Sequence, residues 1–236
     1  MDDYLKNAGK PIDVNRPLIV AGYYDSLDDI FNGPTTNNTA TQNKLIPGDF
    51  LYMDFNGDGE IQDNYDRVPM KNLSYPLSTY GFSGGLNYKR FGISFNFYGV
   101  SQISKQVDGN LYWDLGDGNS GVYTASPDVI YTWTLENADI ATKPVLHSDH
   151  RGYSMRANTT YLFQDASYLR LKNLELNYHI SNKLIKDLGI SKLQVYASGN
   201  NLITFTNYFK NIDPEQSGAF VYPIIKRYNL GVRLSF

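Results

Sequence analysis

The chain has 236 residues, of which 42% are hydrophobic and 14% aromatic, and its formal net charge is -3. A chain of this length can bury one sizeable core or form one part of something larger. With 19% charged residues and no basic excess, the composition gives no footprint for nucleic acid, and the absence of cysteine excludes disulfides and thiolate metal sites.

The N-terminal residues, MDDYLKNAGK, are polar and lack the charged and apolar regions of a signal peptide. The sequence contains no run of about 18 apolar residues, so no transmembrane helix is predicted. A membrane β-barrel remains open, because barrel strands alternate in polarity and give no hydropathy peak. A mean hydropathy of -0.40 is compatible with such a barrel.

The first predicted strand is PLIVAGYY at 17–24, where the alternation is poor. It is followed by GDFLYMDFNGDGEIQDNYDRV at 48–68, whose centre is similar to a calcium loop of the EF-hand type. Gly59 would supply the sharp turn, but Tyr65 stands where the closing carboxylate belongs, and no helix pattern flanks the loop. A plain Asn/Asp/Gly turn explains the stretch as well as Ca²⁺ does. The candidate ligands are Asp54, Asn56, Asp58, Glu60 and Asp66.

Clear period-2 alternation begins at 79–98, where two strands meet at a tight KRFG turn at 89–92. A further strand is predicted over 167–180, with a change of phase near Asn173 that one extra residue, a β-bulge, would explain. The last two strands run through 193–198 and 227–236. On the final strand the apolar parity is carried by Tyr228, Leu230, Val232, Leu234 and Phe236.

In these strands one parity is rich in Tyr and Phe, and the other in Gly, Ser and Asn. A lipid-facing band with aromatic girdles and a watery lumen have these two compositions. Strands of about 10 residues, at roughly 3.3 Å each and tilted by about 40°, span roughly 25 Å of hydrocarbon. A soluble β-sandwich also alternates, so the strand pattern alone favours neither fold.

The connection lengths favour the barrel. The turn at 89–92 and the connection at 181–191 are short, whereas those at 24–77, 102–160 and 205–226 are long, and the two kinds alternate. Outer-membrane barrels have short periplasmic turns and long extracellular loops. We therefore predict an all-β fold of antiparallel, up-and-down strands in a transmembrane β-barrel, with six strands if 17–24 is counted.

Two aromatic pairs in the 102–160 connection are candidate contacts for a ligand or a partner, with packing inside the loop as the favoured alternative: Tyr112, Trp113, Tyr131 and Trp133. The hypothesis that the chain is an enzyme is supported best by HSDHRG, which brings His147, Asp149 and His150 close together in the sequence. A polar loop tip explains that stretch equally well, and we do not expect catalysis.

Five ordered segments resemble the SusC/RagA family of TonB-dependent outer-membrane transporters of Bacteroidota. They are PGDFLYMDFNGDGEIQDNYDRV, YPLSTYGFSGGLNYKRFGISFNFYG, DASYLRLKNLELNYHI, LQVYASGNNLITFTNY and YNLGVRLSF, which cover most of 47–236. The chain departs from the family's loop pattern at Gln62, where an Asp is common, and by an insertion before Asp66.

The resemblance covers only the C-terminal part of the family's barrel of about 22 strands, so residues 1–236 are expected to be a segment without the plug domain. It implies nutrient import, with glycans or peptides as cargo, a SusD-like surface lipoprotein as lid, and TonB as energy source through the missing N-terminal part. The final strand, ending at Phe236, would be the signal read by the outer-membrane insertion machinery. The alternative is a secreted, soluble, calcium-stabilised β-sandwich that binds glycans.

Overall fold

The computed structural model describes residues 3–36, 44–107, 125–147, 158–181, 185, 189–209, 212–216 and 221–236. The chain divides into two compact units. The loop unit consists of Met1–Ser74 and Lys105–Gln164, and the sheet unit consists of Tyr75–Ser104 and Asp165–Phe236.

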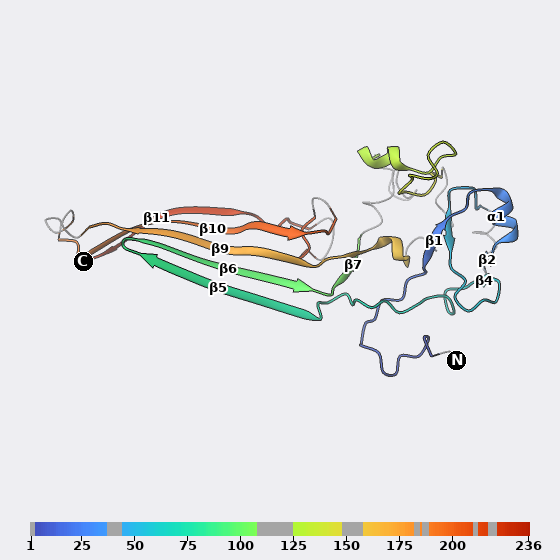
Figure 1. Cartoon of the computed structure of the whole chain (residues 1–236), viewed down its shortest axis with the longest axis horizontal. Helices are drawn as coiled ribbons and strands as arrows, with labels where there is room; N and C mark the ends of the chain where they lie inside the picture. Colours follow the sequence, from blue (N-terminus) through green and yellow to red (C-terminus); the bar gives the residue numbers. More distant parts are fainter. Residues whose placement is uncertain are drawn as a thin grey trace. The chain divides into compact units, whose positions relative to one another are not determined.

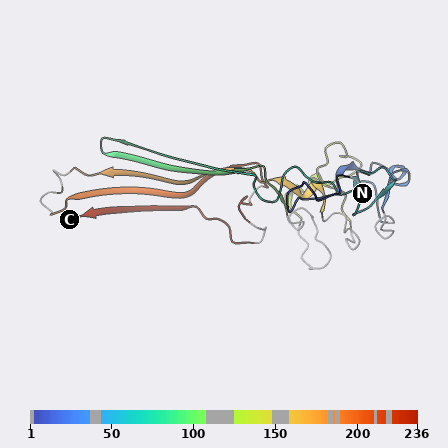
Figure 2. The same ribbon diagram turned by 90° about the horizontal axis from the view of Figure 1, so that it is seen from below.

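The sheet unit is built on one five-stranded antiparallel sheet in the order β11-β10-β9-β6-β5 (Figure 1). Neighbouring strands in the sheet follow one another in the chain order of these five, as in an up-and-down barrel wall. They also run side by side in the view turned by 90° (Figure 2). The strands are β5 (Ser78–Tyr88), β6 (Phe91–Ser101), β9 (Tyr168–His179), β10 (Lys192–Thr206) and β11 (Arg227–Ser235).

The predicted hairpin is confirmed, with a turn of only two residues. Tyr88 at the end of β5 pairs with Phe91 at the start of β6, which leaves Lys89 and Arg90 as the turn. Lys89 has a φ of 56°, in the left-handed region that tight hairpin turns require. Because the sheet is antiparallel, this turn and the β9–β10 connection lie at one end of it, and the long connections leave from the other.

The predicted bulge is also confirmed. Against β6, Phe97 pairs with Leu171 and Asn96 with Asn173, so Lys172 is an extra residue in β9. Against β10, the extra residue lies instead in the stretch between Asn200 and Ile203. The bulge changes the phase of β9, so that the leucines before and after it stay on the same face of the sheet.

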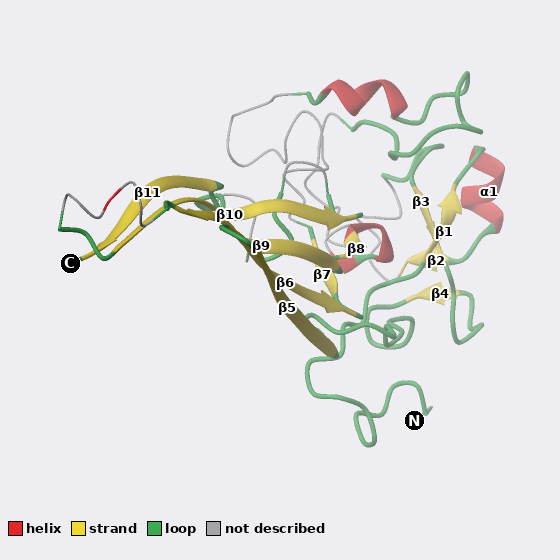
Figure 3. Cartoon of the chain, turned by 60° about the vertical axis from the view of Figure 1, so that its left-hand side comes forward, coloured by secondary structure: helices red, strands yellow, loops and turns green. Residues whose placement is uncertain are grey.

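The loop unit contains shorter elements (Figure 3). In it β1 pairs antiparallel with β3, and β2 pairs parallel with β4. A third two-stranded sheet pairs β7 with β8. The elements are β1 (Val20–Tyr23), α1 (Leu27–Asn32), β2 (Thr35–Thr36), β3 (Phe50–Tyr52), β4 (Glu60–Ile61), β7 (Ser104–Gln106), η2 (Pro127–Tyr131), η4 (Thr160–Leu162) and β8 (Phe163–Asp165).

Helix α1 starts at a capping box. The Ser26 hydroxyl accepts a hydrogen bond from the Asp29 backbone, and the Asp29 carboxylate accepts one from the Ser26 backbone. These bonds satisfy two groups that a helix start otherwise leaves unpaired. No helix among the residues described is long and apolar enough to cross a membrane.

The core of the loop unit lies around Phe50. Leu18, Phe50, Tyr52 and Ile61 are buried together, and Tyr161 packs its ring on Phe50 with 4.9 Å between centroids. Aromatic pairs at such distances add about 0.5–1.5 kcal/mol beyond the area they bury. The core therefore joins segments far apart in the sequence, from both stretches of the loop unit.

The prediction that 17–24 is a sixth strand of the barrel wall is wrong. This segment forms β1, which pairs with β3 rather than with any strand of the five-stranded sheet. Leu18 is fully buried in the loop unit's core. The physical reason lies in the poor alternation, because a segment without one continuous apolar parity cannot present a whole face to lipid.

Candidate functional site

The candidate functional site is the five-stranded sheet, because its two faces differ in chemistry. The backbone register places apolar side chains side by side across the strands on one face, here called the apolar face. Two complete rows are Leu86, Ile93, Leu176, Ala197 and Leu230, and Tyr88, Phe91, Tyr178, Val195 and Val232. The same parity continues toward the far end of the strands through Phe82 and Phe97, whose rings stack at 4.8 Å.

The apolar face is exposed rather than covered. Its large side chains include Leu230, which is 86% exposed, and Leu86, which is 67% exposed. An apolar patch that runs over five strands far exceeds the scattered exposed side chains of an ordinary soluble protein. Such a patch marks a surface that contacts lipid or another apolar partner.

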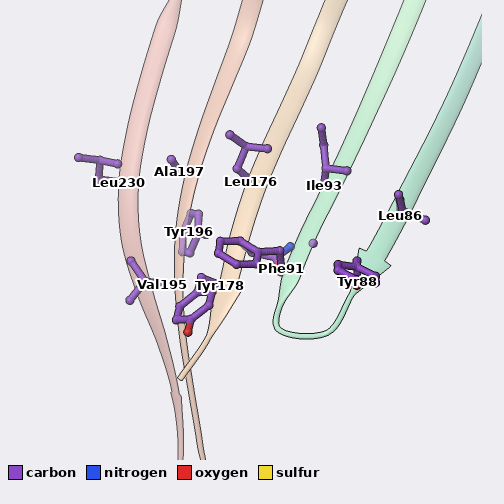
Figure 4. A pocket seen from close by; sticks show the side chains of 12 residues that line it. Leu86, Tyr88, Phe91, Ile93, Leu176, Tyr178, Val195, Tyr196, Ala197 and Leu230 are labelled. Atoms are coloured by element: carbon purple, nitrogen blue, oxygen red, sulfur yellow. The ribbon is translucent and has the colours of Figure 1, made fainter. Parts of the chain in front are cut away.

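Near the turn end, the apolar face is hollowed (Figure 4). The hollow has a volume of about 410 Å³ and contacts all five strands. Ala197, the smallest side chain of its row, lies between Leu176 and Leu230. In the neighbouring row the rings of Phe91 and Tyr178 lie with 4.7 Å between their centroids. The hollow therefore follows from a small residue among large ones.

The opposite face, here called the polar face, has a hydrogen-bonded network. Arg233 of β11 binds both carboxylate oxygens of Glu175 on β9 at 2.8 and 2.9 Å, and its guanidinium lies 4.2 Å from the Tyr196 ring centroid. Asn200 donates to Asn173 at 2.6 Å. A sheet with one polar and one exposed apolar face has the two surfaces that a barrel wall needs, toward water inside and lipid outside.

A second cluster on the polar face holds a long connection against the strands. Arg170 of β9 is fully buried, and it donates to Thr204 of β10, to Glu215 and to both oxygens of Asp213. Tyr168 donates from its hydroxyl to Glu215. This set of five residues, here called the Arg170 cluster, fixes the segment 212–216 to the sheet. No local pattern predicts this cluster, because nothing in LRLK distinguishes a buried arginine from a solvated one.

The calcium-like loop is held by its own backbone. Asp54 accepts hydrogen bonds from Gly57 and Gly59, each at 2.7 Å. Asn56 accepts from Asp58, and Asp58 accepts from Glu60. The carboxylates thus already serve as caps of the turn, as the Asn/Asp/Gly alternative expects. Each oxygen keeps a second lone pair, so these bonds do not exclude a cation.

Asp66, the predicted closing ligand, is fully buried and joins the two ends of the same loop. Its carboxylate accepts from the backbone of Phe55 at 2.8 Å and from that of Gln62 at 2.7 Å. Among the residues described, no three His, Cys, Asp or Glu side chains gather in an arrangement that could hold a metal ion. Calcium binding by the loop stays a prediction.

The aromatic candidates fall into different environments. Tyr112 and Trp113 lie outside the described residues, and Tyr131 is 45% exposed. Trp133 is only 4% exposed and lies against Gly48, whose φ of 91° lets the backbone pass close to the ring. The position of Trp133 fits packing inside the loop unit and offers no open ring face for stacking on a ligand.

His147, the first histidine of HSDHRG, has a structural contact. His147 Nε2 lies 3.0 Å from each carboxylate oxygen of the buried Asp49. Asp49 in turn accepts a hydrogen bond from the backbone of Ile46. These contacts connect two distant segments of the loop unit. Asp149 and His150 lie outside the residues that the structure describes.

Comparisons with known proteins point in one direction. No family model matches the chain. TonB-dependent receptor P3 of Formosa agariphila is 27% identical over 206 residues, which cover 80% of this chain and 19% of that protein. The TonB-dependent receptor SusC of Bacteroides thetaiotaomicron is 27% identical over 195 residues, covering 80% of this chain and 18% of SusC.

Solved structures agree. The RagAB peptide importer in its open-open state aligns with a TM-score of 0.63 and 26% identity over 80% of this chain and 21% of that one. Its closed-closed state covers 92% of this chain and 22% of that one with a TM-score of 0.64, at 24% identity, and supports the fold alone.

The chain is similar to a segment of the SusC/RagA-like TonB-dependent receptors. The resemblance seen in the sequence motifs is thereby confirmed, as is the all-β, antiparallel fold. The chain spans about a fifth of the length of the curated relatives it matches. The relatives are named as receptors.

The C-terminal strand of the chain has the predicted alternation. Tyr228, Leu230, Val232 and Leu234 lie on the apolar face of β11, with exposures between 50% and 86%, and Phe236 follows the strand at 88%. β10 pairs along the whole of β11, and β11 is the last strand at its edge of the described sheet. A role for these five residues in assembly stays a prediction.

Proposed function

We propose that this segment forms the C-terminal part of the barrel wall of a TonB-dependent importer in the outer membrane. The observation that carries the proposal is the exposed apolar face of the five-stranded sheet, backed by a polar face with hydrogen-bonded side chains. The strands β5 and β6 have 11 residues each, about the length that crosses a bilayer when tilted.

The cargo is proposed as a nutrient, either an oligosaccharide or a peptide. One curated relative is named SusC, and the solved relatives are peptide importers, so the relatives do not favour a single class. The polar face could line the path of either cargo, because its Asn, Ser, Glu and Arg side chains offer hydrogen bonds suited to both. Cargo selection would also depend on parts of the receptor outside this segment.

The proposed partners follow from the family resemblance. They are a SusD-like surface lipoprotein over the long loops, the TonB complex acting through an N-terminal plug, and the outer-membrane insertion machinery at the C-terminal strand. The RagAB structures are of an importer named for two components, which supports a two-component assembly for the receptor proposed here. The bilayer itself would contact the apolar face.

The alternative, a secreted β-sandwich that binds glycans, needs a second sheet over the apolar face. Within the described residues, each of the five strands has a large side chain exposed on this face, from Ile93 at 38% to Leu230 at 86%. In a soluble protein these side chains would be exposed to water unless a second layer covered them. Each Å² of apolar area left in water forgoes roughly 25 cal/mol of stabilisation. This exposure favours the barrel wall over the sandwich.

The proposal is tested by blotting native membranes with an antibody against the 102–160 loop, in boiled and unboiled samples. A heat-shifted band on the order of 100 kDa in the outer-membrane fraction is expected, since a closed barrel of about 22 strands needs a much longer chain. A soluble band of about 27 kDa without a heat shift would overturn the proposal and favour the secreted domain, since the segment alone has a mass of 26.7 kDa.

A further inference from the structure

We propose that the hollow on the apolar face, together with the basic turn Lys89–Arg90, binds one anionic glycerophospholipid. This inference rests on the proposed function, because it requires the apolar face to contact a bilayer. It goes further by assigning one ligand class to one place on that face. The acyl chains would lie in the hollow, and the phosphate would contact the turn.

The hollow suits an acyl chain. Its volume of about 410 Å³ lies within the range of small-molecule pockets, roughly 300–1,000 Å³. Its lining is aliphatic and aromatic apart from Asn177 and the tyrosine hydroxyls, and no acidic side chain is among the lining residues. A hydrocarbon chain in the hollow touches side chains on several sides, whereas on a flat sheet face it touches them on one side only. The dispersion attraction is larger in the hollow, because it grows with the number of neighbouring atoms.

The turn supplies positive charge at the rim of the hollow. Tyr88 and Phe91, which both line the hollow, are joined by Lys89 and Arg90 (Figure 4). The Lys89 ammonium lies 5.2 Å from the Tyr88 ring centroid, so the aromatic wall directs this cation toward the rim.

Arg90 is held in place as well, because it donates to the Ser181 hydroxyl at 3.0 Å. Serine is uncharged, so this contact leaves the positive charge of Arg90 available to an anion. Guanidinium and ammonium groups beside each other are the side chains that proteins use for phosphate. Charge at the bilayer surface and an apolar hollow below it match the two halves of a phospholipid.

The geometry also distinguishes this place from the rest of the apolar face. In the middle of β5 and β6, Phe82, Phe95 and Phe97 instead pack their rings against one another, with 4.8–6.4 Å between centroids. Lipids there would exchange freely, as ordinary boundary lipids do. A lipid seated between Leu176 and Leu230 over Ala197 would be retained longer, because it is enclosed by neighbouring side chains.

The test uses the receptor purified from native membranes, stripped of lipid in detergent and titrated with phosphatidylglycerol under native mass spectrometry. One retained lipid is expected in the wild type. Ala197→Phe, which fills the hollow, is expected to abolish retention, while Ile203→Phe on the same face of β10, away from the hollow, should keep it. Lys89→Asn is expected to lower lipid occupancy about fivefold, which is the contribution of one cation to binding at an anionic lipid surface. Lys226→Gln, at the other end of the strands, should leave occupancy unchanged.

Diacylglycerol with the same acyl chains separates the two halves of the site, and it should bind clearly more weakly than phosphatidylglycerol. Heat-shift gels of each variant show whether its barrel is intact. Wild-type receptor with a heat shift but no retained lipid, or equal retention in Ala197→Phe and Ile203→Phe, would overturn the lipid site alone. Absence of the heat shift in the wild type would overturn the proposed function instead.

Discussion

Arg170 and Asp213 form a pair in which one guanidinium nitrogen lies 2.6 Å from both carboxylate oxygens. Arg170 is on β9 and has no exposed surface, while Asp213 is in the connection between β10 and β11. The remaining guanidinium nitrogens bond to Glu215 and Thr204, so the buried charge is fully paired. One side chain of the barrel wall thus anchors a long loop.

Replacing Arg170 with Leu should release the segment 212–216 from the sheet. Removing one member of a buried pair typically costs about 3–5 kcal/mol, because the remaining charges lose their partner. We expect proteinase K to cleave within 207–226 much faster in the variant, in outer-membrane vesicles. Lys226→Gln, an exposed charge in the same connection, is the control, and equal cleavage of all three proteins would contradict an anchoring role for Arg170.

Asp66→Asn should loosen the calcium-like loop. An amide oxygen can accept only one of the two backbone bonds that the Asp66 carboxylate accepts, and the other position would place an NH₂ group against an N–H. A loss of about 1–3 kcal/mol in local stability is expected. Hydrogen exchange of peptides spanning 50–68 measures it. Asp63→Asn, which removes a carboxylate paired with Arg67 at the surface, should change exchange little.

Calcium binding by Asp54, Asn56 and Asp58 makes a separate prediction for the same peptides. A bound cation would stabilise the loop by mass action. Hydrogen exchange at 54–60 should therefore be slower in about 1 mM Ca²⁺ than in the presence of a chelator. Identical exchange in both buffers would show that the hydrogen bonds from Gly57 and Gly59 suffice to hold the loop.

Gly48 and Gly57 allow a matched test of packing against Trp133. Both have positive φ, 91° and 75°, so alanine at either position costs about 1–2 kcal/mol in backbone strain. At Gly48 the added Cβ would also lie 2.7 Å from Trp133 Cδ2 and from Val145 Cβ, whereas at Gly57 it meets nothing within 4 Å. Gly48→Ala should therefore lose about 1–3 kcal/mol more than Gly57→Ala. Hydrogen exchange of peptides spanning 44–53 in the intact receptor would report the difference.

Phe236→Ser tests the assembly prediction. If the terminal aromatic is part of the signal on β11, the heat-shifted fraction in the outer membrane should fall severalfold while total protein before insertion is unchanged. Ser235→Ala, one residue earlier and of the opposite parity, should assemble normally. Normal assembly of Phe236→Ser would show that the exposed ring is merely an apolar end residue.

The strands of the sheet unit could be predicted from the sequence because each repeats a two-residue pattern over six or more residues. Even the bulge at Lys172 left a trace, as the leucines change parity there. The compensating irregularity in β10 between Asn200 and Ile203 left none, because a turn-like GNN stretch does not say which strand absorbs the extra residue.

The loop unit was less predictable for a physical reason. Its strands have two to four residues, too short for any periodicity, and β1 finds its partner β3 only through the core around Phe50. Likewise, the Arg170 cluster joins residues more than 40 positions apart through side-chain bonds that local patterns do not encode. In both cases tertiary packing, rather than local preference, decides the structure.

The most direct test of the central claim is the environment of alternate residues on β6. These 236 residues contain no cysteine, so single cysteines at Phe95, Phe97, Ser94 and Asn96 can each receive a spin label in the membrane-embedded receptor, after any cysteine outside them is replaced by serine. The account predicts high collision with oxygen, which concentrates in lipid, at Phe95 and Phe97, and high collision with a water-soluble nickel complex at Ser94 and Asn96. Low collision with both reagents at Phe95 and Phe97 would mean a covered protein core, and it would contradict a lipid-facing sheet.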